Sequence, residues 1–108
     1  MAEITRQNLS LSGTSLNYVS ASDGGDYFRN NDSTNLFIKN TDASSLTVTI
    51  SAQRQCNHGF LHDQEITVAA GEEVVISEME TSRFNDENGD VQIDYNDYTL
   101  AEVAVVRY

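Results

Sequence analysis

The chain contains no proline and no tryptophan, and its single cysteine is Cys56. One cysteine rules out an intramolecular disulfide, so a hydrophobic core must stabilise the fold without a covalent cross-link. At 108 residues the chain is long enough to bury such a core as one domain. Without proline, any exposed sheet edge must be protected by charge, and Lys39, Glu65 and Glu102 are candidates for that role.

Basic residues are also scarce. Six Lys and Arg residues stand against 17 Asp and Glu residues, which gives a formal net charge of -11. A chain of this charge repels phosphate backbones and anionic lipid headgroups, so we expect neither nucleic acid nor membrane as a partner. Basic protein surfaces, cations or neutral groups such as sugars are more plausible partners. A simpler interpretation is that the negative charge only keeps the protein soluble.

Long apolar runs are missing too. The first twenty residues have neither a basic start nor an apolar stretch, so they do not read as a signal peptide. No segment has the apolar length that a membrane-spanning helix needs. We therefore expect a soluble protein that is made in the cytosol.

What the chain does have is a series of short segments in which apolar and polar residues alternate. The clearest begins at Leu46, where every second residue up to Ala52 is apolar and the residues between them are Thr or Ser. This period of two is typical of a strand with one buried face. The predicted strands are Asn35–Asn40, Leu46–Gln53, Glu65–Ala69, Glu73–Glu78, Val91–Tyr95 and Thr99–Tyr108.

The strand spacing and the lack of any helix-length amphipathic segment predict an all-β fold. We expect a single antiparallel β-sandwich of about six to eight short strands, jelly-roll-like or immunoglobulin-like. A partly closed barrel fits the same pattern. Ala70-Gly71-Glu72 is typical of a hairpin turn and predicts pairing between the strands on either side. The polar residues 1–15 predict a loosely ordered N-terminal arm, followed by a sandwich domain over residues 16–108 with a short strand near Ser15–Ser20.

One segment combines residues that could bind a metal or act in catalysis. Cys56, His58 and His62 are three potential zinc ligands within seven residues, and Asp63 follows them. Zinc requires four tetrahedral ligands, and this spacing matches no standard paired-ligand signature. We therefore favour a loop between strands over a metal site. A Cys–His nucleophile pair is the least favoured interpretation, because the sequence offers no group to orient the histidine.

No other catalytic constellation is evident. Asn85–Asp90 places carboxylates and amides before a glycine, as calcium loops do, but lacks their terminal glutamate and flanking helices. A tight acidic turn is the better interpretation. We therefore predict that the protein is not an enzyme and needs no cofactor.

Several segments after Gly25 resemble a known group of proteins. They are Gly25–Asn31, Leu36–Asn40, Leu46–Ile50, Val68–Glu72, Arg83–Asp86 and Val103–Arg107. Together they resemble small all-β structural proteins of tailed-bacteriophage heads, of the capsid cement (decoration) type. The resemblance extends over about residues 25–108 and leaves out the N-terminal arm.

The resemblance implies a virion protein that binds the outer surface of the major capsid protein at capsomer junctions, often as a trimer, after synthesis in the bacterial cytoplasm. Such a protein needs a rigid frame with exposed contact loops. The turns at Asn30–Ser33, Thr41–Ser45 and Asn85–Asp90 are the candidates. The residues predicted to contact the capsid are Asn30, Asn31, Asp32, Ser33, Asn85, Asp86 and Asn88.

Other functions stay open at this point. The same fold would serve a head–tail joining or tail component. It would also serve a carbohydrate- or receptor-binding module, in which some of the five tyrosines could stack on sugars.

Overall fold

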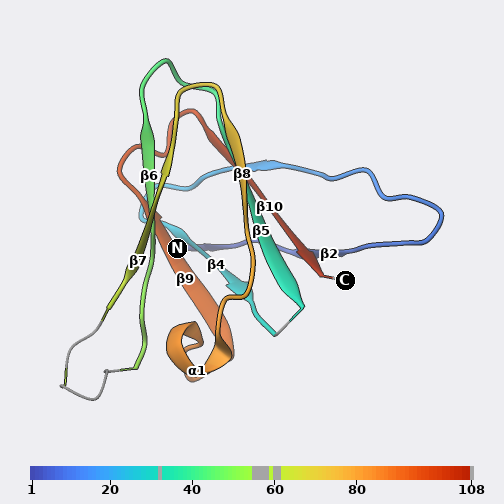
Figure 1. Cartoon of the computed structure of the whole chain (residues 1–108), viewed down its shortest axis with the longest axis vertical. Helices are drawn as coiled ribbons and strands as arrows, with labels where there is room; N and C mark the ends of the chain where they lie inside the picture. The colour runs from blue at the N-terminus through green and yellow to red at the C-terminus, as the bar shows by residue number, and fades with distance from the viewer. Residues whose placement is uncertain (32, 55–58, 60–61, 108) are drawn as a thin grey trace.

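The computed structural model describes residues 1–31, 33–54, 59 and 62–107. Over these residues the fold is two facing β-sheets with one helical turn, α1 (Thr81–Phe84) (Figure 1). This confirms the predicted all-β class. The strands are β1 (Ala2–Glu3), β2 (Arg6–Asn8), β3 (Val19–Ser20), β4 (Asp26–Arg29), β5 (Thr34–Asn40), β6 (Leu46–Ile50), β7 (Gln64–Val68), β8 (Glu73–Ile76), β9 (Asp90–Tyr95) and β10 (Ala101–Arg107).

The strand order explains how the chain builds both layers. The first sheet has the order β1-β4-β9-β6-β7, and the second has the order β2-β10-β5-β8, with β3 also paired to β10. Most neighbours are antiparallel, but β1 pairs with β4, and β2 with β10, in parallel. Both sheets are therefore mixed, whereas the sequence predicted antiparallel pairing throughout.

The core lies between the two sheets and follows from the alternation in the sequence. In β6, Leu46, Val48 and Ile50 are buried while Thr47 and Thr49 are partly exposed. Ile38 of β5 and Ile93 of β9 are fully buried on the facing sides of the two layers. Burial of such aliphatic side chains is the main favourable contribution to folding.

Strand β10 is buried on both of its faces. Val103 and Val105 point into the core, as predicted, but Ala104 and Val106 are also almost completely shielded from solvent. On its edges β10 pairs with β5 over seven residue pairs and with both β2 and β3. The continuous apolar run in its sequence is therefore that of a central strand.

The N-terminal segment differs from the predicted arm. Residues 2–8 belong to the sandwich, because β1 extends the first sheet, β2 extends the second, and Ile4 between them is buried in the core. Only residues 9–18 leave the sheets, as a loop that projects to one side (Figure 1). The polar composition did not predict these strands, because strands pair through backbone groups, which are the same in polar and apolar residues.

Tyr18 attaches the end of that loop to the outer face of the second sheet. Its hydroxyl donates a hydrogen bond to a carboxylate oxygen of Glu73 on β8. Lys39 Nζ of β5 lies 3.9 Å from the centroid of the Tyr18 ring, a cation–π contact. Partial burial and the neighbouring Glu73 carboxylate raise the pKa of Tyr18 to about 12.

The predicted hairpin at Ala70-Gly71-Glu72 is wrong in its pairing. The turn exists, with Gly71 at a φ of 73° and a hydrogen bond from Glu72 N to Ala69 O at 3.0 Å. However, β7 pairs with β6 in the first sheet, and β8 pairs with β5 in the second. The turn thus carries the chain from one layer to the other, and β7 and β8 are the open edges of the two sheets on the same side of the molecule.

The new placement of the N-terminus makes a stability prediction. Ile4→Ala should lower the free energy of unfolding by about 2–5 kcal/mol, because it leaves a cavity in the core. Leu11→Ala, in the exposed part of the loop, should change it by about 0.5 kcal/mol or less. Urea unfolding followed by circular dichroism measures both values, and equal small effects would mean that residues 1–8 are not part of the folded core.

Candidate functional site

Two of the three predicted contact loops meet at one end of the sandwich. The β4–β5 turn and the α1–β9 turn both lie at the end where α1 sits (Figure 1). The backbone N of Asn30 donates to Gly89 O at 3.1 Å and joins the two turns directly. The third loop, residues 41–45, follows the other end of β5 and so lies at the opposite end of the molecule. A partner with a flat surface could therefore contact the loops at one end of the sandwich or the loop at the other, but not all three together.

A reciprocal pair of amide side chains fixes the two turns together. Asn30 Nδ2 donates to Asn85 Oδ1 at 2.7 Å and to Met79 O at 2.9 Å. Asn85 Nδ2 donates in return to Asn30 O at 3.1 Å and to Gly89 O at 3.4 Å. Asn30 is 5% exposed, so it does not present its side chain to a partner as the sequence predicted. Its role is to hold the turns in one arrangement.

The rest of the β4–β5 turn is ordered by its own side chains. Asn31 Oδ1 accepts hydrogen bonds from Ser33 N and from the Thr34 hydroxyl, each at 3.0 Å. These bonds make a compact Asx turn, in which Asn31 and Ser33 are both partly exposed. Asp32, also predicted to contact the partner, lies outside the described residues.

Asp86 organises the α1–β9 turn in a similar way. Its Oδ1 accepts the backbone N–H groups of Asn88 (2.8 Å) and Asp90 (3.0 Å), and its Oδ2 accepts Gln92 Nε2 at 3.1 Å. Burial alone would raise the pKa of Asp86, but these hydrogen bonds and the positive charge of Arg29 outweigh it and lower the pKa below the ordinary 3.8. The carboxylate is thus mainly a support for the turn.

The turn is closed by an ion pair at the start of β9. Arg29 Nε lies 3.5 Å from Asp90 Oδ1, and Asp90 is almost fully buried. Asp90 Oδ1 has no hydrogen-bond partner in the described part of the chain, so the contact with Arg29 is electrostatic. Because the Arg29 side chain is 60% exposed, it contributes little to stability on its own.

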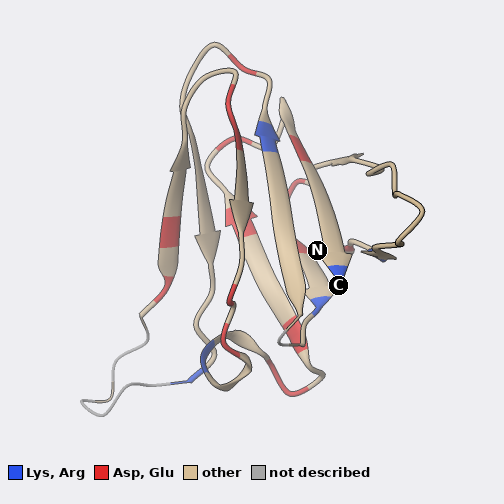
Figure 2. Ribbon diagram, turned by 45° about the vertical axis from the view of Figure 1, so that its right-hand side comes forward, with Lys and Arg blue, Asp and Glu red and all other residues tan. Residues whose placement is uncertain are grey.

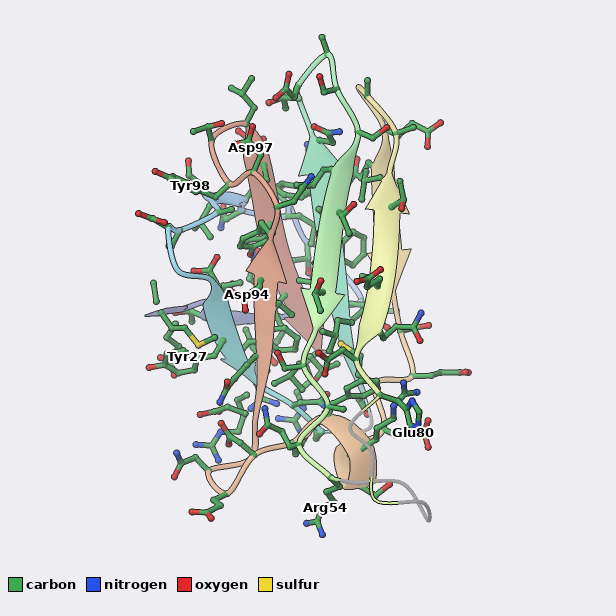
Figure 3. The ribbon with its side chains drawn as sticks, turned by 90° about the vertical axis from the view of Figure 1, so that its left-hand side faces the viewer. Tyr27, Arg54, Glu80, Asp94, Asp97 and Tyr98 are labelled. Atoms are coloured by element: carbon green, nitrogen blue, oxygen red, sulfur yellow. The ribbon has the colours of Figure 1, made fainter. Side chains whose placement is uncertain are left out.

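The surface that remains for a partner surrounds a shallow polar hollow of about 510 Å³. Asn88 and Glu87 are its exposed members from the predicted loop. Arg54 also lines it and lies at the same end of the molecule as α1 (Figure 3). Sequence reasoning missed Gln53, Arg54 and Gln92, which complete the lining. Gln53 and Gln92 carried a signal as polar-face residues in alternating segments, whereas Arg54 carried none.

The predicted zinc ligands can be placed only in part. Cys56 and His58 lie outside the described residues. His62 is exposed, and its carbonyl oxygen accepts hydrogen bonds from Arg83 Nε (3.3 Å) and from Arg83 Nη2 (2.7 Å). Asp63 accepts the Ala52 N–H at 2.7 Å, which ties the start of β7 to the end of β6.

Within residues 1–31, 33–54, 59 and 62–107, no three His, Cys, Asp or Glu side chains gather as a metal site would require. The same ranges hold no helix that is long and apolar enough to cross a membrane. Comparison of the chain with protein-family models, curated proteins and solved structures found no match.

The Asn30–Asn85 pair makes a second stability prediction. Asn30→Ala should cost about 1–3 kcal/mol of unfolding free energy, because it leaves the acceptors on Met79 and Asn85 without their donor. Asn30→Asp should cost more, since it directs a carboxylate at those acceptor oxygens. Asn88→Ala, at an exposed position of the adjoining turn, is the control and should leave stability within about 0.5 kcal/mol. Urea unfolding at neutral pH measures all three, and an unchanged Asn30→Ala variant would contradict the structural role.

Asp86 makes a prediction about pH. Because folding lowers its pKa, the carboxylate stabilises the native state above the ordinary pKa of 3.8, and this stabilisation is lost as the pH falls below that value. Asp86→Asn should therefore be less stable than the wild type by about 1 kcal/mol at neutral pH. The gap should narrow in acid, whereas Glu87→Gln should follow the wild type. Unfolding free energies measured from pH 7 to pH 2 test this, and a gap that is constant with pH would contradict it.

Proposed function

We propose that the protein is a structural component of a tailed-bacteriophage head, a capsid cement protein that binds the outer surface of the major capsid shell at capsomer junctions. The observation that supports this most directly is the joining of two contact loops into one preorganised surface. The Asn30–Asn85 pair holds both turns at the end of a stiff sandwich. A surface already ordered before binding loses little conformational entropy when it docks.

The charge of the chain supports an exterior location. With a formal net charge of -11, the protein would be repelled by the DNA packed inside a head but not by a basic patch on the shell. The resemblance of residues 25–108 to phage head proteins points the same way. We further propose that the protein acts as a homo-oligomer, with a trimer at each junction, and that it carries out no reaction there.

Co-sedimentation with undecorated, expanded capsids tests the proposal. We expect saturable binding, with a copy number that rivals that of the major capsid protein. Absence of binding at low salt and high protein concentration would overturn it. A low copy number confined to one vertex would instead indicate a head–tail joining or tail component.

A pair of matched variants identifies the end that binds. Asn88→Arg places a bulky cation on the loop surface described above, and Ala43→Arg makes the same change in the exposed loop at the opposite end. We expect Asn88→Arg to weaken capsid binding and Ala43→Arg to leave it unchanged. The reverse result would assign the contact to residues 41–45.

The polar hollow favours one alternative. Its lining consists of amides, carboxylates and Arg54, groups that form hydrogen bonds with sugar hydroxyls. No tyrosine among the described residues lines it, although aromatic stacking is a common part of sugar recognition. Glycan-array binding that is lost in a Gln92→Ala variant would favour a carbohydrate-binding module over a cement protein.

A further inference from the structure

The open edge of β7 is a second surface with the properties of a binding site, on the side of the sandwich rather than at its loop end. In the described part of the chain, β7 pairs with β6 alone and forms one margin of the first sheet. It is five residues long and contains no proline. Such an edge can accept a further strand from another chain.

The hydrogen-bond pattern shows which backbone groups face outward. Thr47 O accepts from Asn96 N, and Ser51 N donates to Gln92 O, so the odd-numbered residues of β6 bond to β9. The even-numbered residues therefore bond to β7, where they lie opposite Gln64, Ile66 and Val68. Glu65 and Thr67 consequently direct their backbone groups away from β6. Glu65 O accepts a hydrogen bond from the flexible side chain of Gln64, at 3.3 Å.

A cleft runs beside this edge, between β7 and the end of β8. We call it the β7–β8 cleft; its volume is about 310 Å³. The apolar part of its wall comes from both sheets and from α1. The lining residues that form this part are Ile50, Ile66, Ile76, Met79 and Phe84. A strand added to β7 would point alternate side chains toward this wall, on the same face as Ile66 and Val68.

The surroundings of the cleft are strongly acidic. Residues 62–84 carry six carboxylates and one guanidinium. The Asp and Glu residues lie along β7, β8 and the segment that leads to α1 (Figure 2). Glu78 and Glu80 line the cleft itself, while Glu65 lies on the outer face of β7. The one cation, Arg83, is directed to the carbonyl of His62 and to the ring of Phe84.

Glu78 is also held in an unfavourable backbone conformation. Its φ is 57°, in the left-handed region where glycine or asparagine would be less strained. Strain of this kind persists where the surrounding structure enforces the conformation, and it is common at binding sites.

We propose that the β7 edge binds an extended segment of a partner protein in which apolar residues alternate with lysine or arginine. The segment adds to the first sheet as a strand beside β7. Its apolar side chains enter the β7–β8 cleft, and its basic side chains lie on the other face near Glu65. A second copy of this acidic chain is a poor occupant, because like charges would meet along the edge.

A short, end-blocked peptide that alternates lysine with valine is the probe. NMR titration should show saturable binding, and the amide hydrogens of Glu65 and Thr67 should become protected from exchange, since they then bond to the added strand. A peptide with glutamate in place of lysine should not bind. A lysine–valine peptide with a central proline, which keeps its charge, should bind weakly and protect neither amide.

Protein variants separate strand addition from general attraction. Glu65→Gln should weaken binding about two- to fivefold, as for loss of an exposed ion pair. Glu3→Gln makes the same change at the opposite margin of the sheet, on β1, and should have no effect. Thr67→Pro removes an outward N–H that β6 does not use, so it should abolish binding; its circular dichroism spectrum checks that it folds.

Three results would overturn the proposal. They are absence of binding at millimolar peptide, binding without protection of Glu65 and Thr67, and protection in the free protein that rises with its own concentration. The last result, with a dimer in sedimentation, would assign the edge to a second copy. Capsid co-sedimentation tests the proposed function separately, because that experiment does not use this peptide.

Discussion

The pairing of β10 with β5 is the interaction on which the remaining architecture depends. It joins residues 34–40 to residues 101–107 over seven pairs, and the same strand β10 then provides the partner for β2 and β3. Both faces of β10 are buried. In the second sheet, β10 is thus paired along both edges and buried on both faces. Its inward-facing Val103 and Val105 pack in the core against the first sheet. Loss of this pairing would separate β10, with β2 and β3, from β5 and β8 and so divide the second sheet in two.

The two ends and the open side of the sandwich are built in different ways. At the end with α1, amide and carboxylate side chains form hydrogen bonds within the protein, as Asn30, Asn85 and Asp86 do. These bonds hold the two turns at that end in one arrangement. Along the open side, β7 and β8 are margins of their sheets and carry the exposed carboxylates of Glu65 and Glu73. The first kind of surface suits docking onto a fixed lattice, and the second suits capture of a flexible chain.

Sequence patterns predicted the strands well where a two-residue period is visible, as in Leu46–Ile50 and Asp90–Tyr95. They failed where pairing depends on distant residues. A turn such as that around Gly71 looks the same whether it closes a hairpin or crosses between sheets. The N-terminal residues carry no apolar period, yet they pair through their backbones. Polar turn residues were correctly marked at Asn30, but its burial follows from partners 49 and 55 positions away, which no local pattern reveals.

The placement of β2 also has a consequence for synthesis. This strand forms from residues 6–8 and needs residues 105–107 as its neighbour. During translation β2 is made before β10, so the second sheet cannot be completed until β10 has been made, since a pairing requires both of its strands. Until then β5 can pair with β8 on one edge, but its other edge lacks the β10 strand. The nascent chain is thus a candidate for chaperone binding, and folding of this sheet is completed after the ribosome has delivered β10.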